Sequence, residues 1–460
     1  MRSAFVIAAP GSGSGKTTVT LGILAALRRR GLRVQPFKVG PDYIDPSHHA
    51  RITGRPSHNL DTWMIPRAVN RRLFHSWGAD ADVAVVEGVM GLFDGVDGHR
   101  FDGSTAHLAR ILRLPVVLVV DARSMARSAA AVVQGFASFT PRVPITGVVW
   151  NRVASPSHRR ILDEALSPAG LPPSLGALPP EPELALPERH LGLVTPEDAA
   201  LPSTWEDRLA CWVEDHLDLD RLLERTPAPP APRLPAPRRR DGARSVAVAR
   251  DAAFCFYYEE NIRLLERAGA RIIDFSPLAG DGVPPEADAV YLGGGYPEVH
   301  AERLAANQAF LDGLRGHHSQ GRPIYAECGG FMVLCRSLQA PGGGRVPMAG
   351  IFPARARMRS GRFHLGYREV EVEGAAGLDG LTARGHEFHY SELEAPPQGV
   401  ETVYRVRNAR GEELGREGYR SGSALAGYIH LHFASCPDLP LRWLGLSGPR
   451  PCRTPGRTRP

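Results

Sequence analysis

The chain has 460 residues, of which 43% are hydrophobic, and a formal net charge of +6. This length suits two or three ordinary domains, and because no apolar run approaches the ~20 residues of a membrane span, the sequence predicts a cytoplasmic protein without a signal peptide or a membrane partner. The positive charge comes from arginines in two segments, 226–244 and 447–460, so the remainder carries no basic excess and nucleic acid is not an expected partner.

The first 225 residues alternate short apolar segments with helical patterns. Residues 16–29 carry apolar side chains at the helical period. Short strands rich in β-branched residues are typical of a parallel sheet covered on both faces. We therefore expect a doubly wound α/β domain over 1–225. Its expected strands are 4–9, 33–39, 82–86, 115–120 and 145–149.

A phosphate-binding motif lies between the first expected strand and the first helix. Residues 10–17 fit the P-loop pattern GxxxxGK[ST], except that proline replaces the first glycine. Glycines let backbone N–H groups converge on phosphate oxygens, and the helix N-terminus adds its dipole. Lys16 is expected to reach the phosphates of ATP and Thr17 to bind Mg²⁺. The predicted nucleotide-binding residues here are Gly11, Ser12, Gly13, Ser14, Gly15, Lys16, Thr17 and Thr18.

Charged residues end the neighbouring strands. Only Lys16 and Lys38 among the 55 basic residues are lysines, which indicates sites that need a compact ammonium rather than a guanidinium. Lys38 is therefore also assigned to the nucleotide site. Glu87 follows an apolar strand and is the expected second magnesium ligand. Asp42 and Asp94, which lie in glycine-containing turns, are further candidates, although turn aspartates are common without a metal.

A proline-rich linker over 226–243 is expected to be extended and semi-rigid. A second α/β pattern follows over 244–446, with a helix at 261–268 that ends at Gly269. The tail 447–460 is expected to be disordered. The expected strands of this second domain are 245–249, 271–275, 289–292 and 323–326.

Cys328 differs from the other five cysteines, which are scattered without zinc-like or disulfide spacing. It lies between an expected strand and the apolar helix 331–334, so the sequence predicts a nucleophile on a sharp turn, whose thiol pKa the helix N-terminus lowers. Backbone N–H groups of Gly294, Gly295 and Gly329 are expected to form an oxyanion hole.

The thiol needs a base, and two histidines near the C-terminus are available. His430 and His432 point the same way if their segment is extended. A metal pair is the competing interpretation, but no third ligand has suitable spacing.

Together these motifs resemble the cobyrinate a,c-diamide synthases, which join a dethiobiotin-synthetase-like ATPase domain to a class I glutamine amidotransferase domain. The resemblance covers nearly the whole chain outside the linker and the tail. Besides the P-loop it rests on segments 37–46, 87–95, 293–298, 326–330 and 386–391.

The resemblance implies roles for particular residues. Cys328 attacks the glutamine amide, and His430 matches the general base. The family of triad amidotransferases has an acid two residues beyond that histidine, and here the position is His432. Asn151 resembles the residue that reads adenine. The residues implied at the carboxylate acceptor site are Tyr43, Asp45 and Asp94.

The implied reaction uses Mg²⁺ and ATP to phosphorylate a peripheral carboxylate of a corrinoid, and ammonia from L-glutamine then displaces the phosphate. The family amidates the a and c side chains. The sequence leaves open whether the corrinoid contains cobalt, in which order the two sites react, and the oligomeric state, with a homodimer as one option.

Four other interpretations remain at this point. Cobyric acid synthase shares the same logic but amidates four different sites, and nickel-sirohydrochlorin a,c-diamide synthase differs only in the tetrapyrrole. CTP synthase normally keeps His-x-Glu, which the His430–His432 string lacks. A P-loop switch protein with an inactive glutaminase-like module is opposed by Gly11, where the partition ATPases carry a lysine.

Overall fold

The computed structural model describes residues 1–189, 192–193, 201–232, 244–340, 342–359, 364–375 and 377–443. The chain divides into two compact units, 1–235 and 236–460. The division falls within the proline-rich segment. Most of that segment and the C-terminal tail lie outside the described residues, so their expected conformations stay predictions. No helix of the described ranges is both long and apolar enough to cross a membrane.

The first unit is built on a seven-stranded parallel sheet with the order β3-β2-β4-β1-β5-β6-β7. Its strands are β1 (Ser3–Ala8), β2 (Val34–Val39), β3 (His58–Leu60), β4 (Val83–Glu87), β5 (Val116–Asp121), β6 (Ile145–Asn151) and β7 (Ser174–Leu178). The five expected strands are present, and β3 and β7 extend the sheet at its two edges.

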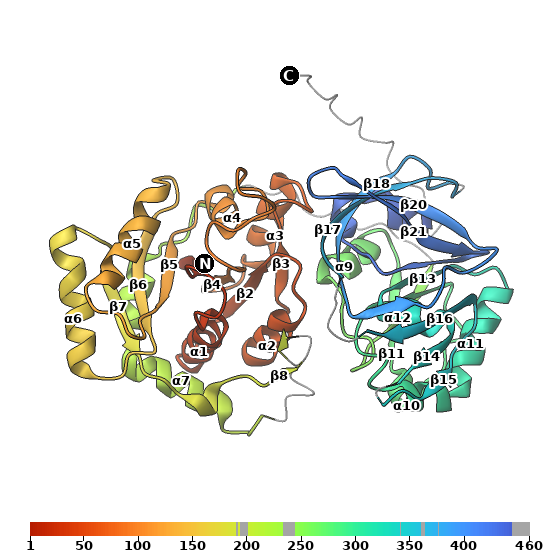
Figure 1. Cartoon of the computed structure of the whole chain (residues 1–460), viewed down its shortest axis with the longest axis horizontal. Coiled ribbons are helices and arrows are strands. Elements are labelled where there is room, and N and C mark those ends of the chain that lie inside the picture. Colours follow the sequence, from red (N-terminus) through yellow and green to blue (C-terminus); the bar gives the residue numbers. More distant parts are fainter. Residues whose placement is uncertain are drawn as a thin grey trace, which may run out of the picture. The chain divides into compact units, whose positions relative to one another are not determined.

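Helices cover both faces of this sheet (Figure 1), and the alternation along β5 shows why. Val117 and Val119 pack into a core with α1 and α7, whereas Leu118 and Val120 pack into a separate core with α5 and α6. A strand that is apolar on both faces can be buried only between two layers. The helices are α1 (Lys16–Arg29), α2 (Ile44–Thr53), α3 (Arg67–Trp77), α4 (Thr105–Leu112), α5 (Ser128–Phe139), α6 (Pro156–Leu166), α7 (Trp205–His216) and α8 (Leu219–Arg225).

The segment after α8 begins as part of the first unit. Thr226 accepts a hydrogen bond from the backbone of Ala4 (2.9 Å), and the Ser3 and Thr226 hydroxyls are 2.7 Å apart. Ala228 donates to the carbonyl of Arg2 at 3.1 Å. The first residues of the segment after α8 are therefore held at the start of β1 by hydrogen bonds. A short pair, β8 (Glu188–Arg189) and β9 (Gly192–Leu193), lies before α7.

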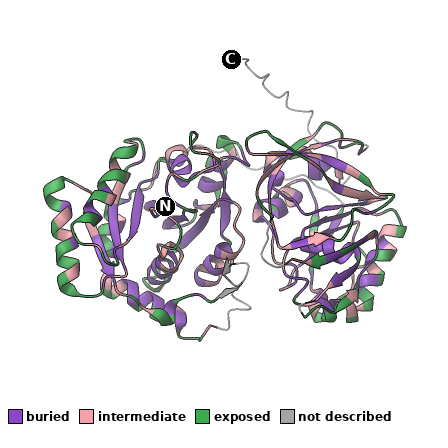
Figure 2. Cartoon of the chain, in the orientation of Figure 1, coloured by how far each residue is buried: buried purple, intermediate pink, exposed green. Residues whose placement is uncertain are grey.

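The second unit has a mixed ten-stranded sheet with the order β11-β10-β12-β13-β22-β21-β20-β17-β18-β23. The first five are parallel, and they include the four expected strands. They are β10 (Ser245–Ala249), β11 (Arg271–Phe275), β12 (Ala289–Leu292), β13 (Ile324–Glu327) and β22 (Ala424–Gly427). Four of these strands are buried throughout (Figure 2), whereas the edge strand β11 is partly exposed.

The remaining strands of this sheet are antiparallel and were not expected from the sequence. They are β17 (His364–Val372), β18 (Thr382–His389), β20 (Glu401–Asn408), β21 (Glu413–Ser421) and β23 (His430–Leu431). A smaller sheet contains β14 (Cys335–Gln339), β15 (Arg345–Pro347), β16 (Phe352–Met358) and β19 (Ser391–Leu393). The helices are α9 (Glu259–Arg267), α10 (Ala301–Ala306), α11 (Gln308–Ser319), α12 (Gly329–Leu334) and α13 (Asp438–Trp443).

Candidate active sites

The P-loop turns at two glycines with positive φ, Gly13 (78°) and Gly15 (81°). A side chain at Gly15 would overlap the Asn151 amide, so the close approach also requires glycine. The Asn151 side chain donates to the carbonyl of Ser14 at 2.9 Å, which ties the end of β6 to the loop. Asn151 thus lies beside the expected phosphate site, and Lys16 Nζ donates to the Met90 carbonyl at 3.1 Å.

Carboxylates from three segments surround Lys38, whose side chain is only 3% exposed. Its Nζ is ion-paired with Asp45 and lies 3.1 Å from Glu87 and 3.6 Å from Asp42. Because β2 and β4 are adjacent and parallel, with Lys38 paired to Glu87, the two side chains emerge at the same edge. This is the convergence that the sequence predicted for strand ends.

Thr17 completes this group at the start of α1. Its hydroxyl donates to Glu87 Oε1 at 2.7 Å and approaches Asp45 Oδ2 at 3.4 Å. These oxygen atoms are the ligand type that Mg²⁺ prefers. The oxygens of Thr17, Glu87 and Asp45 therefore fit a magnesium ion, and the assignment of Asp45 to the acceptor site stays a prediction.

Burial and neighbouring charges act together on these groups. Burial disfavours the ammonium of Lys38, but Asp45 and Glu87 outweigh it and raise its pKa. Burial and the charge of Lys38 both lower the pKa of Lys16. Burial raises the pKa of Asp45, whereas Lys38 keeps the pKa of Glu87 low against its burial. The site therefore holds a buried cation among carboxylates.

Three other predicted residues lie near this group in different settings. Asp42 Oδ1 accepts from the backbone of Ile44 (2.8 Å) and Asp45 (3.2 Å), so it caps the start of α2. Tyr43 immediately precedes that helix. Asp94 accepts from the backbone of Gly91 at 2.8 Å and so shapes the loop after β4. The structure thus uses Asp42 and Asp94 to fix backbone turns.

His49 was not singled out from the sequence. Its Nε2 lies 2.7 Å from Glu87 Oε2, and both side chains are fully buried. The sequence feature that could have identified His49 is its spacing from Asp45. His49 follows Asp45 by four residues on α2, so the two side chains share one face of the helix.

The second site is centred on Cys328, between β13 and α12. Its backbone has φ 47° and ψ −105°, a conformation that non-glycine residues rarely adopt. The predicted sharp strand-to-helix turn is therefore present, and such a turn presents a nucleophile to substrate.

The N–H group at the start of α12 lowers the thiol pKa as expected, but the net shift is upward. Burial raises the pKa of Cys328 strongly and the carboxyl of Glu298 raises it further, while a hydrogen bond from Gly329 N–H does not compensate. α12 has only six residues, so its dipole is small. The resting sulfur is a thiol that needs a base.

The predicted oxyanion glycines converge on this turn. Side chains added at Gly294 would overlap the His430 ring and lie 3.4 Å from Cys328 Cβ. A side chain at Gly329 would lie 3.1 Å from the backbone nitrogen of Gly295. The three glycines thus lie close to the cysteine turn or to one another, where a larger side chain at Gly294 or Gly329 would not fit.

His430 lies on β23, which is only two residues long. Its imidazole is 1% exposed, and the Cε1–Nε2 edge is the part nearest the space above Gly294 and Cys328. The opposite atom, Nδ1, lies 3.6 Å from Glu327 Oε2. The ring also stacks on His386 with centroids 5.0 Å apart.

His432 lies outside the strand and has different partners. Its Nδ1 accepts from the backbone of Ala434 at 3.3 Å, so it caps a short 3₁₀ turn, and its ring packs on Tyr258. Burial lowers the pKa of His432 to about 3. The carboxylate beside His430 is that of Glu327, the residue before the cysteine, and the role expected for His432 stays a prediction.

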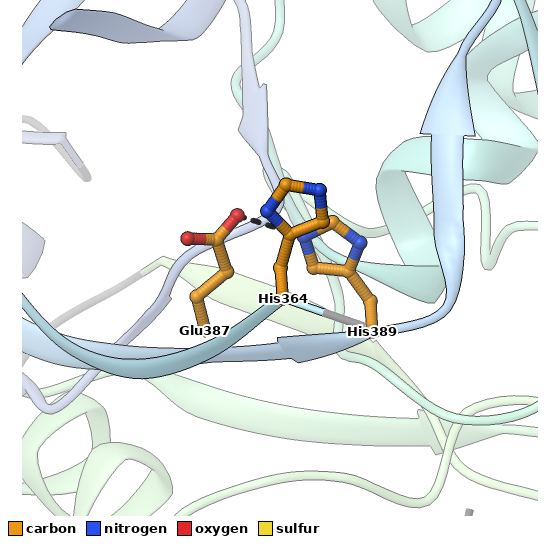
Figure 3. A group of neighbouring side chains, drawn as sticks. All are labelled: His364, Glu387 and His389. Carbon is orange, nitrogen blue, oxygen red and sulfur yellow. Dashed lines mark hydrogen bonds and ion pairs between the residues drawn. The ribbon is translucent and has the colours of Figure 1, made fainter. Parts of the chain in front are cut away.

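A third group of titratable side chains joins His364, Glu387 and His389, whose ligand atoms all lie within 4.8 Å (Figure 3). Both carboxylate oxygens of Glu387 are already paired, one with Arg368 at 2.7 Å and one with His389 at 2.8 Å. Glu387 thus joins Arg368 of β17 to His389 of its own strand β18 in an ion-pair network.

Comparison with known proteins assigns each unit to a domain family. Residues 5–194 match the CobQ/CobB/MinD/ParA nucleotide binding domain, and residues 245–437 match the CobB/CobQ-like glutamine amidotransferase domain. The cobyrinate a,c-diamide synthase of Syntrophotalea carbinolica is 46% identical over 94% of this chain and 96% of its own length. The chain belongs to the cobyrinate a,c-diamide synthase family.

Two further relatives share this coverage. The cobyrinate a,c-diamide synthase of Salmonella typhimurium is 43% identical, over 96% of this chain and 97% of its own. The hydrogenobyrinate a,c-diamide synthase of Brucella abortus is 44% identical, over 93% and 98%. The family confirms the predicted pairing of a P-loop domain with a glutamine amidotransferase domain, and it makes the chain a ligase that takes its nitrogen from glutamine.

Proposed function

We propose that this chain amidates the a and c carboxylates of cobyrinate or hydrogenobyrinate, using ATP and glutamine. The observation that carries the proposal is that relatives with these two names align over nearly the whole chain, which contains both a P-loop and a cysteine elbow. A free carboxylate is a poor electrophile, so conversion to an acyl phosphate supplies the leaving group that ammonia displaces.

In the ATP half, Lys16 and the P-loop amides bind the phosphates, and Asn151, which contacts the P-loop at Ser14, reads the adenine as the resemblance implies. Thr17, Asp45 and Glu87 would hold Mg²⁺, which neutralises phosphate charge. Lys38 supplies a second, buried ammonium close to these groups. ATP transfers its γ-phosphoryl group to the corrinoid carboxylate, giving ADP and an acyl phosphate, and ammonia then releases inorganic phosphate.

In the glutaminase half, His430 takes the thiol proton of Cys328, and the sulfur attacks the amide carbon of glutamine. The amides of Gly294, Gly295 and Gly329 stabilise the oxyanion. The imidazolium returns the proton to the departing nitrogen, which leaves as ammonia. Water, deprotonated by His430, then hydrolyses the thioester to glutamate and restores the thiol.

Mass spectrometry of the products tests the substrate assignment. The enzyme is incubated with ATP and glutamine, and with cobyrinate, hydrogenobyrinate or nickel-sirohydrochlorin in separate reactions. We expect a diamide from one or both corrinoids. A product from nickel-sirohydrochlorin alone, or amidation at more than two corrinoid carboxylates, would contradict the proposal. The cytoplasmic location and a homodimer remain predictions.

A further inference from the structure

The Glu327 carboxylate lies beside the glutaminase centre and is almost fully enclosed, with 1% exposure. Its Oε1 accepts from the Tyr325 hydroxyl at 2.8 Å and from the backbone of Leu431 at 3.0 Å. Its Oε2 accepts from the Tyr291 hydroxyl at 3.2 Å. These neutral donors hold the carboxylate in one position.

His430 is the titratable partner that Oε2 faces, at 3.6 Å from Nδ1. The Nε2 edge of the same ring is on the side of Cys328. The sulfur, the imidazole and the carboxylate are therefore arranged in series. This is the order of a nucleophile, a base and an orienting acid.

We propose that Glu327 is the positioning carboxylate of the glutaminase centre and acts through His430. The inference rests on the proposed roles of Cys328 and His430. The negative charge of Glu327, 3.6 Å from Nδ1, favours the tautomer that carries its proton on Nδ1, in which Nε2 is free to take the thiol proton. When that proton arrives, the carboxylate stabilises the imidazolium. The acid thus comes from the residue before the nucleophile rather than from the position of His432.

The other groups that face His430 do not serve this role. His386 stacks on it from β18, but burial and the charge of His430 lower the pKa of His386 well below its usual value, so it stays neutral. The loop after β12 faces the His430 ring with Gly294, which has no titratable side chain. Cys328 is the proton donor. Glu327 is therefore the carboxylate that faces Nδ1 of this ring.

The test compares Glu327→Gln with a matched substitution, Glu417→Gln. The amide introduced by Glu327→Gln keeps an oxygen for Leu431 and Tyr325 but presents an N–H group to Nδ1, which favours the tautomer with Nε2 protonated towards the sulfur. The Glu417 carboxyl is also buried in this unit, and burial raises its pKa to about 8, so the neutral amide replaces an already neutral acid below that pH.

We expect Glu327→Gln to lower kcat for glutamine hydrolysis roughly 10²–10⁴-fold with little change in KM. Loss of the charge makes protonation of His430 less favourable, so the acid limb of the pH profile should move to lower pH. Ammonia-dependent synthesis should be unchanged. Between pH 6 and pH 7, Glu417→Gln should leave glutamine hydrolysis and ammonia-dependent synthesis near their wild-type rates, because substitutions away from the site usually have small effects.

Two further variants test whether the loss of activity in Glu327→Gln arises through His430. In a His430→Ala background, Glu327→Gln should add no further loss, because Glu327 acts through that ring. Glu327→Asp keeps the charge and should therefore retain more activity than Glu327→Gln. If Glu327→Gln is unstable, Glu327→Asp is used in its place. Wild-type kcat with an unmoved acid limb in Glu327→Gln, an additional loss in the double variant, or a Glu327→Asp variant as inactive as His430→Ala overturns the proposal. If Cys328→Ala and His430→Ala still hydrolyse glutamine, the proposed glutaminase roles themselves fail.

Discussion

The two histidines near the C-terminus differ in their partners, so their substitutions should differ in effect. We predict that His430→Ala lowers glutamine hydrolysis about 10²–10⁴-fold, the usual cost of losing a general base. His432→Ala should retain a much larger fraction, because His432 caps a turn and packs on Tyr258. Steady-state kinetics of glutaminase activity measure both.

Ammonia-dependent synthesis serves as the control for this pair, since neither residue lies in the P-loop unit. A His432→Ala variant that is as inactive as His430→Ala while keeping its thermal stability would contradict the assignment. A His432→Ala variant with lowered Tm would instead reflect the lost cap, whose removal typically costs about 0.5–2 kcal/mol.

Sequence reasoning located most site residues but not their interactions. The P-loop, Lys38, Glu87 and Cys328 stand out because each follows or ends a strand. The role of Glu327 could not be read, since its contact with His430 joins β13 to β23, which are distant in the sequence. The expected direction of the Cys328 pKa shift was missed for a related reason. Burial decides that direction, and burial depends on the packing of the whole unit, whereas the helix N-terminus is a local feature.

At the level of elements, the turn after β12 approaches the catalytic ring so closely that it requires glycine. We predict that Gly294→Ala, whose new methyl group would overlap His430, lowers glutamine hydrolysis at least about tenfold while ammonia-dependent synthesis continues. Kinetics of the two reactions check this.

Gly316→Ala is the matched control, because it lies in α11 with open space around the added carbon. It should leave activity unchanged and stabilise the unit by about 0.5–1 kcal/mol, since alanine loses less backbone entropy in a helix. Equal losses in the two variants would show that the Gly294 effect is not local.

β21 carries a buried acid that links stability to pH. One Glu417 oxygen accepts from the backbone of Tyr428 at 2.6 Å, and burial raises the pKa of Glu417 to about 8. In the unfolded chain the carboxyl ionises near its ordinary value, so the folded state binds the extra proton between about pH 4.5 and pH 8. Folding stability contributed by this group therefore falls as the pH rises through that range.

We predict that Glu417→Gln removes this dependence. As the pH rises from 5 to 9, the Tm of wild type should fall relative to the Tm of the variant. The variant's Tm minus the wild-type Tm should therefore increase steadily over this range. Thermal unfolding at several pH values measures it. A constant Tm difference across the range would show that Glu417 is not held protonated.

The elements that sequence reasoning found are those whose patterns are local. Parallel strands buried on both faces are continuous apolar runs, and all nine expected strands are present. The antiparallel strands β17, β18, β20 and β21 were missed, because arginine and glutamate recur along them and pair across the sheet. Arg405 and Glu413 illustrate this, at 2.8 Å. Such strands resemble charged surface segments until their partners are known.

At the scale of the whole molecule, the two activities occupy two compact units of one chain. We predict that Cys328→Ala abolishes glutamine-dependent synthesis but keeps synthesis from ammonium salts, because ATP binding and acyl phosphate formation use the first unit. Corrinoid product formation with each nitrogen source measures this. Loss of both activities in a variant with unchanged Tm would contradict the division of roles.

The near absence of lysine has a practical consequence for chemical labelling. Reagents that acylate amines attack the neutral form, and Lys38 is buried and strongly ion-paired, so it should not react. Lys16 is half-buried and burial lowers its pKa, which leaves it as the accessible lysine besides the N-terminal amine. We predict that an amine-reactive ester modifies Lys16, that ATP blocks the modification, and that peptide mapping locates it. Amine coupling to a sensor surface would therefore immobilise part of the protein through its own nucleotide site, so attachment through a tag or a thiol avoids this loss.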